Sequence, residues 1–234
     1  SGNDSLDLDS SSNTNYEHIL LPIANVEKMD QLLDFAIFLK DAKSVNPISI
    51  LTVVSNNDEA EINIKKARSK LEDFVKQASA SETNISIITT IDHNPGSGIA
   101  RISKEIMSDI IVLGWPQKTG LIDKLIGEKV ANIMNSTDKC AFICHIDKPT
   151  NTHKRIIVAA PPLAEHEKGF EMWMRKVSKL AQEFSIPVHI YCNQNTGKMV
   201  EKCSKKIKTS ANIQVILFDD WEDFLVLSRN IHQD

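Results

Sequence analysis

The sequence predicts an α/β protein built from two tandem units, each with a parallel sheet flanked by helices. Apolar, β-branched segments of strand length alternate with segments whose apolar residues recur at helical spacing. The pattern then restarts. Residues 18–23 are similar to 155–160, and 47–50 are similar to 187–190, about 140 residues further along the chain. This internal repeat indicates two units rather than one large domain.

The first unit is predicted to contain strands alternating with helices. The strands are near-continuous apolar runs, as expected where both sheet faces are covered, at 18–23, 48–54, 85–91, 109–113 and 141–146. Apolar spacing predicts helices at 29–37, at 67–78, from Gly98 onward and after Gly120.

The second unit is predicted to be shorter. Its strands are expected at 155–160, 187–190 and 213–218, with helices at 170–184, at 198–208 and after Asp220. Nothing after these elements corresponds to the fourth and fifth strands of the first unit, so the second unit is expected to be incomplete. We predict two stacked units with separate sheets: a disordered linker or tail at 1–15, a first unit at 16–147 and a partial second unit at 154–234.

Composition limits the possible functions. The 234 residues are 41% hydrophobic and 25% charged, with a net charge of −4, as in an ordinary globular protein without a basic surface. We therefore expect no nucleic-acid partner. The longest apolar stretches have strand length, shorter than the roughly 18 residues of a membrane helix. The chain starts with Ser1 and a polar leader, which favours a domain taken from a larger protein.

The four cysteines do not predict a metal site. Cys140 and Cys144 fall on one predicted strand, about 13 Å apart, too far for a disulfide or a shared metal. We expect the cysteines to act as small buried apolar residues in a reducing compartment, although His145 and His153 nearby leave a zinc site as the alternative.

A glycine-bounded loop between a strand and a helix is the most informative segment. Gly114 directly follows the strand predicted at 109–113, and the loop continues through Gly120. A helix start offers free N–H groups and a positive dipole end, which suit phosphate. Glu128 would repel a phosphate by about 1–3 kcal/mol. The alternative is that the glycines only permit a tight turn and close packing.

Two further features have a functional and a structural interpretation. The turn at 94–98 resembles a phosphate turn, but the structural alternative is a Pro-Gly turn with Ser97 as the helix cap. Asp92 and His93 at a strand end could perform acid–base chemistry. A solvated turn is the alternative, and the chain lacks a recognised nucleophile motif. We therefore predict no catalytic residues.

The order of the elements and the spacing of Gly114, Gly120 and Gly127 resemble the universal stress protein family. Residues 17–146 resemble it well, and 154–230 resemble it in part. The resemblance implies Rossmann-like units with strand order 3-2-1-4-5, pairing through the edge strand at 141–146, and an adenine-nucleotide site. The positions of this degenerate site are Ala24, Val53, Gly96, Gly114, Gln117, Gly120, Gly127 and Glu128.

Three of these positions depart from the family's nucleotide-binding pattern. Gln117 stands in place of a glycine, Glu128 in place of serine or threonine, and Ala24 in place of an aspartate that contacts the nucleoside. The resemblance therefore implies adenine-nucleotide binding that is weak or absent, with no other cofactor and no metal.

The tandem arrangement also resembles the cytosolic C-terminal regions of bacterial cation/proton antiporters. This resemblance implies a non-enzymatic regulatory or sensor module at the cytosolic face of the inner membrane, with the membrane part of the same antiporter as its partner. The alternative is a stand-alone cytosolic stress protein that binds ATP or another adenine nucleotide. Self-association, or pairing of the two units, is expected in either case.

Overall fold

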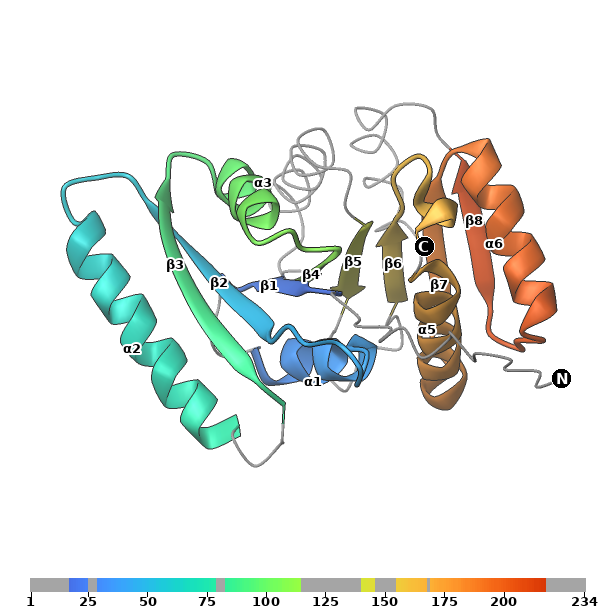
Figure 1. The fold of residues 1–234 in the computed structure, drawn as a ribbon, viewed down its shortest axis with the longest axis horizontal. Coiled ribbons are helices and arrows are strands. Elements are labelled where there is room, and N and C mark those ends of the chain that lie inside the picture. Colours follow the sequence, from blue (N-terminus) through green and yellow to red (C-terminus); the bar gives the residue numbers. More distant parts are fainter. Residues whose placement is uncertain are drawn as a thin grey trace, which may run out of the picture.

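The computed structural model describes residues 17–24, 29–78, 83–114, 140–145, 155–167 and 169–217. The described strands form one eight-stranded sheet in the order β3-β2-β1-β4-β5-β6-β7-β8, with helices on both faces (Figure 1). The first half contributes β1 Ile19–Pro22, β2 Ile48–Ser55, β3 Ile85–Asp92, β4 Ile110–Gly114 and β5 Cys140–His145. The second half contributes β6 Arg155–Ala159, β7 Val188–Cys192 and β8 Ile213–Leu217.

Each half of the sheet is parallel, as predicted, and the first half has the implied order 3-2-1-4-5. The two halves meet where β5 pairs with β6 in antiparallel orientation, from Ala141 opposite Ala159 to His145 opposite Arg155. The prediction that the two units pair through the edge at 141–146 is therefore confirmed. The prediction of separate, stacked sheets is wrong, because the β5 edge is completed by hydrogen bonds to β6 and the two parallel sheets become continuous.

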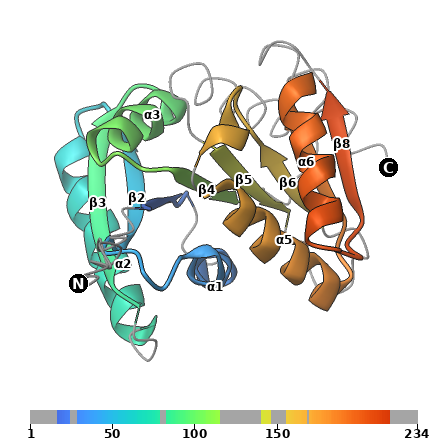
Figure 2. The ribbon, with the colours of Figure 1, turned by 45° about the vertical axis from the view of Figure 1, so that its right-hand side comes forward.

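The helices that the structure describes are divided unequally between the two faces of the sheet. Two apolar clusters lie on opposite faces of it. The larger holds residues of α1 (Met29–Leu39), α2 (Ala60–Ala78), α5 (Phe170–Phe184) and α6 (Gln194–Lys206). The smaller holds Ile99 and Ile102 of α3 (Pro95–Glu105). Figures 1 and 2 accordingly show α3 at the top and α1 at the bottom.

The start of α3 differs from the prediction. The helix begins at Pro95, not near Gly98, and its N-cap is Asn94, not Ser97. Proline suits the first helical position because its missing N–H needs no partner there. Asn94 has extended backbone, and its side-chain oxygen accepts hydrogen bonds from the N–H groups of Gly96 and Ser97. The segment is thus the first turn of a helix rather than a free glycine loop.

The two halves are also joined away from the sheet. The ammonium of Lys176 on α5 donates hydrogen bonds to the carbonyl oxygens of Leu39 and Lys40, both at 2.7 Å, where α1 ends. Glu17, just before β1, lies close enough to influence the charge of Lys176. A side chain of the second half thus supplies partners for carbonyls at a helix end of the first half.

The helix predicted after Gly120, the helix predicted after Asp220 and the polar segment at 1–15 lie outside the described residues. Within the part of the chain that is described, no helix is both long enough and apolar enough to cross a membrane.

Candidate functional site

The first candidate position is the carboxyl end of the sheet where β1 and β4 lie side by side. In open parallel sheets, ligands bind at the carboxyl ends of strands where the strand order reverses. Here β1 pairs with β2 on one side and with β4 on the other, so the order reverses at β1. Ala24 lies just beyond the end of β1, and Gly114 is the last residue of β4; both are exposed. The predicted residues Gln117, Gly120, Gly127 and Glu128 lie outside the described residues.

Gly114 makes a close packing contact. A Cβ atom at this position would lie 2.7 Å from Cδ1 of Leu32 on α1, and the Leu32 side chain is buried. Carbon atoms of non-bonded groups are normally 3.5–4.0 Å apart at about their optimum. A glycine at this position therefore lets α1 approach the end of β4, which supports the packing interpretation of Gly114. Ala24 offers only a methyl group, which cannot hydrogen-bond to a sugar hydroxyl.

Val53 lies on β2, and Gly96 lies in the first turn of α3, the helix that packs against Val53 through Gly98. A Cβ atom on Gly98 would lie 2.9 Å from Cγ1 of Val53 and 3.2 Å from Cβ of Asp92. The N–H of Gly96 donates to Oδ1 of Asn94 at 2.8 Å, and Gly96 is buried. The Asn94 side chain therefore occupies a position that an anion would take at this helix start.

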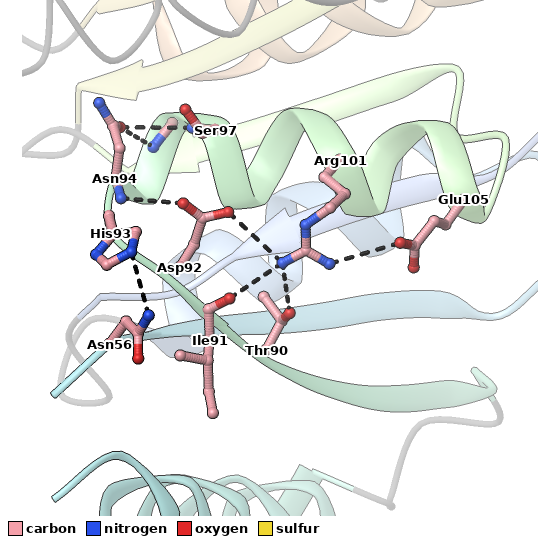
Figure 3. Close-up of polar contacts among 10 residues, drawn as sticks. Asn56, Thr90, Ile91, Asp92, His93, Asn94, Ser97, Arg101 and Glu105 are labelled. Atoms are coloured by element: carbon pink, nitrogen blue, oxygen red, sulfur yellow. Dashed lines mark hydrogen bonds and ion pairs between the residues drawn. The ribbon is translucent and has the colours of Figure 1, made fainter. Parts of the chain in front are cut away.

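A second candidate position is a hollow of about 520 Å³ at the carboxyl ends of β2 and β3, next to α3. Figure 3 shows most of its polar residues, which lie on or directly after β2 and β3 and on α3. The residues that line the hollow are Asn56, Ile64, Thr89, Thr90, Ile91, Asp92, His93 and Arg101.

Arg101 is the charged centre of this hollow. Its Nη2 donates to Oγ1 of Thr90 at 2.8 Å and to the carbonyl oxygen of Ile91 at 3.2 Å. The same nitrogen lies 3.6 Å from Oδ2 of Asp92, and Nη1 lies 3.5 Å from Oε1 of Glu105 (Figure 3). The guanidinium therefore joins α3 to β3 and is balanced by two carboxylates.

Asp92 and His93 make contacts with different partners. Asp92 faces Arg101 and accepts a hydrogen bond from the N–H of Asn94 at 3.1 Å. His93 Nε2 lies 3.2 Å from Nδ2 of Asn56 (Figure 3). An amide nitrogen only donates, so Nε2 accepts and the proton of a neutral ring lies on Nδ1. This arrangement ties the ends of β2 and β3 together and does not aim a base and an acid at a common point.

The sequence interpretation missed Arg101 and Asn56. Parallel pairing of β2 with β3 places Ser55 opposite Asp92, so the residues that follow each strand become neighbours. Asn56 directly follows β2 in the sequence and could have been recognised by this argument. Arg101 lies in the second turn of α3, and its position depends on how that helix crosses the sheet.

The cysteines of the second half are buried and free. Burial raises the pKa of the Cys192 thiol to about 12, with the nearby Glu165 carboxylate acting in the same direction. Burial also raises the pKa of Cys203. Cys140 and Cys144 both lie on β5, as predicted. Among the described residues, no group of three His, Cys, Asp or Glu side chains is arranged to hold a metal ion.

In the second half, a carboxylate of the protein itself lies at the start of α6. Oγ1 of Thr196 donates to Oε2 of Glu165 at 2.7 Å, and the Glu165 side chain is 5% exposed. Asn193 caps the helix by accepting from the N–H of Thr196 at 2.9 Å. Glu165 belongs to a short 3₁₀ helix, η2 (Ala164–His166). The negative charge is well placed near the positive end of the α6 dipole.

The strand order of the first half and the helices on both faces of its parallel sheet define a Rossmann-like α/β fold. The chain belongs to the universal stress protein family, whose model matches residues 15–143, more than half of the chain.

Two comparisons extend beyond this segment. The chain is 22% identical over 225 residues to the Na⁺/H⁺ antiporter NhaS5 of Synechocystis sp. (strain ATCC 27184 / PCC 6803 / Kazusa). The match covers 89% of this chain and 32% of the antiporter, so the chain spans about a third of that relative's length. Among solved structures, a universal stress protein from Archaeoglobus fulgidus DSM 4304 is similar with a TM-score of 0.50 and 15% identity. That alignment covers 94% of this chain and 84% of the other, and it shows a likeness of fold.

The cytoplasmic domain of a prokaryotic cation chloride cotransporter is also similar, with a TM-score of 0.49 and 12% identity. The alignment covers 94% of this chain and 92% of that domain.

Proposed function

We propose that the chain is a non-enzymatic regulatory module of a monovalent cation/proton antiporter. It acts at the cytosolic face of the membrane, next to the membrane part of the same protein. One observation carries this proposal: the similarity to the Synechocystis antiporter covers 89% of the chain and therefore includes both halves of the sheet. The family model, in contrast, matches only residues 15–143.

The described site supports sensing or assembly better than nucleotide chemistry. Ala24 lacks the carboxylate that would contact a nucleoside, and Asn94 already occupies the start of α3. The polar groups of the hollow at Arg101 are paired with one another. We propose that adenine nucleotides bind more weakly than roughly 100 μM, which corresponds to less than about 5.5 kcal/mol of binding free energy.

Transport by the complete gene product tests the proposal. Everted membrane vesicles would be prepared from bacteria that lack their own Na⁺/H⁺ antiporters and express either the complete protein or a deletion of residues 17–217. Addition of Na⁺, Li⁺ or K⁺ should dissipate a preformed proton gradient in both. The deletion should shift the dependence of transport on pH or on cation concentration. A gene without a membrane domain, or a deletion that leaves both dependences unchanged, would contradict the proposal.

A stand-alone, ATP-binding stress protein is the second candidate, because the chain belongs to the universal stress protein family and keeps the glycine spacing of Gly114 and Gly127. Calorimetric titration of the purified chain with ATP distinguishes the two. We expect no saturable heat in the low micromolar range for the natural sequence. Ala24→Asp serves as a matched variant, because it restores the carboxylate at an exposed position. Micromolar affinity without any substitution would favour the second candidate.

A further inference from the structure

β3 forms one edge of the described sheet. β3 is the first strand in the sheet order and pairs with β2 along its whole length. Among the described residues, no strand pairs with its other side. All eight residues of β3 are partly exposed, whereas all four residues of β1 are buried. An edge strand presents a row of backbone groups to which another strand can bond.

The chemistry of β3 makes this edge prone to pairing. Its sequence, ISIITTID, consists of isoleucine, threonine and serine, with a single charged residue at the end. Such short segments of high β propensity and low charge associate readily with a second strand when they are exposed.

The pairing of β3 with β2 determines which carbonyl groups of β3 point away from the sheet. The N–H of Ile48 on β2 donates to the carbonyl oxygen of Asn84 at 3.0 Å, so that carbonyl faces β2. Backbone groups alternate in direction along a strand. The carbonyls of Ile87 and Ile91, an odd number of residues further on, therefore face away from β2. They are four residues apart, which is about 13 Å along the strand.

Two arginines reach these two carbonyl groups. Nη1 of Arg68 on α2 lies 3.5 Å from the carbonyl oxygen of Ile87, and Nη2 of Arg101 on α3 lies 3.2 Å from that of Ile91. The helices α2 and α3 pack on opposite faces of the sheet. Arg68 and Arg101 thus approach the same edge from its two sides.

Each arginine is held in place by a carboxylate four residues along its own helix. Arg68 Nε lies 3.1 Å from Oε1 of Glu72, and Arg101 Nη1 lies 3.5 Å from Oε1 of Glu105. Arg101 also bonds to the Thr90 side chain, as Figure 3 shows. These contacts keep both guanidinium groups over the edge rather than extended into water.

We propose that Arg68 and Arg101 close the β3 edge against pairing with the β3 edge of a second copy of the chain. A strand added at this edge would need the carbonyls of Ile87 and Ile91 as acceptors and would have to displace both arginines. A second copy would bring its own two arginines to the same place, each already paired with a carboxylate, so the contacts of four guanidinium groups would have to be broken for the two edges to meet. Pairing of copies is therefore excluded at β3, and in the described sheet the first half is extended at its other edge, by β6.

The test compares Arg68→Ala/Arg101→Ala with the natural chain by sedimentation velocity and hydrogen exchange. We expect the double alanine variant to form a dimer at concentrations where the natural chain does not pair through β3. The outward-facing amides of Ile85, Ile87, Thr89 and Ile91 should then exchange at least about tenfold more slowly. Each single variant should give a smaller effect.

The matched control is Arg175→Ala/Lys179→Ala. It removes two positive charges and one arginine–glutamate pair, Arg175 with Glu171 at 3.0 Å, from α5 in the second half. We expect this variant to keep the association state of the natural chain. Arg68→Lys/Arg101→Lys should also keep that state, since lysine retains the charge at the edge.

Three results would overturn the proposal. The double alanine variant could keep the natural association state, it could dimerise without protection of the β3 amides, or the natural chain could already protect those amides through a dimer. Thermal unfolding of each variant verifies that the alanine variants are folded, as expected for side chains that are 50% and 42% exposed.

Discussion

Replacing Lys176 by methionine should weaken the contact between the two halves of the molecule. Lys176 lies on α5, and its ammonium donates to the carbonyl of Leu39, the last residue of α1, and to that of Lys40 just beyond it. Methionine keeps the length and the apolar stem of the side chain but cannot donate. The carbonyls at the end of α1 would then lose this partner, and the sheet pairing of β5 with β6 would carry more of the connection.

The size of the effect can be estimated from three contributions. A hydrogen bond to a charged group contributes about 1.5–3 kcal/mol. A cation at a helix C-terminus adds about 0.3–1 kcal/mol. Against this, burial lowers the pKa of Lys176, although Glu17 and Asp41 oppose the shift, so part of the gain is offset by desolvation of the ammonium. We expect a loss of about 1–2 kcal/mol, which lowers the Tm of a chain of this size by about 2–8 °C.

Urea and thermal unfolding of Lys176→Met measure this loss. The matched control is Lys179→Met, which makes the same exchange one turn further along α5 at an exposed position. The control should stay within about 0.5 kcal/mol of the natural chain. If the two variants unfold at the same urea concentration, the contacts of Lys176 with α1 do not stabilise the fold and the reasoning is refuted.

Three further predictions concern single positions. Burial raises the pKa of Glu17 above its ordinary value of 4.5, so the folded state binds the proton more tightly than the unfolded state does. The stability of the natural chain therefore falls as the pH rises from 4.5 through the raised pKa of the folded state. Glu17→Gln should gain more stability relative to the natural chain at pH 7 than near pH 4, as measured by urea unfolding. Gly98→Ala should cost about 1–3 kcal/mol because its methyl group meets Val53, whereas Gly169→Ala, with its nearest atom at 3.5 Å, should cost less. Cys192 should resist iodoacetamide in the folded chain, because its thiol has a pKa of about 12 and is buried; peptide mapping that finds it labelled before unfolding would contradict this.

Strand positions could be predicted well because buried parallel strands are continuous apolar runs that contrast with amphipathic helices. The joining of the two sheets was missed, although the sequence contains a signal for it. Only nine residues separate the end of β5 from the start of β6. A parallel crossover needs a dozen or more. Strands joined by so short a segment either form an antiparallel pair or belong to different sheets. Antiparallel pairing is favoured here, because β5 would otherwise be left as an unpaired edge of the sheet.

The candidate site was harder to predict for a different reason. Two of the glycines lie at positions of close approach, since a Cβ atom on Gly98 would meet Val53 and one on Gly114 would meet Leu32. Glycine, however, is needed equally for packing against a side chain and for binding a phosphate, and the sequence does not distinguish the two. Arg101 was missed because its partner Thr90 lies on another element, and their contact depends on how α3 crosses the sheet.

The way the halves join also limits where a ligand could bind. Ligand crevices in parallel sheets need a reversal of strand order. In the described sheet the order reverses once, at β1, whose neighbours are β2 and β4. From β4 to β8 the strands follow one another in chain order, and β5 occupies the side of β6 where a returning strand would have to pair. The described part of the second half therefore extends the sheet without adding a second reversal of strand order.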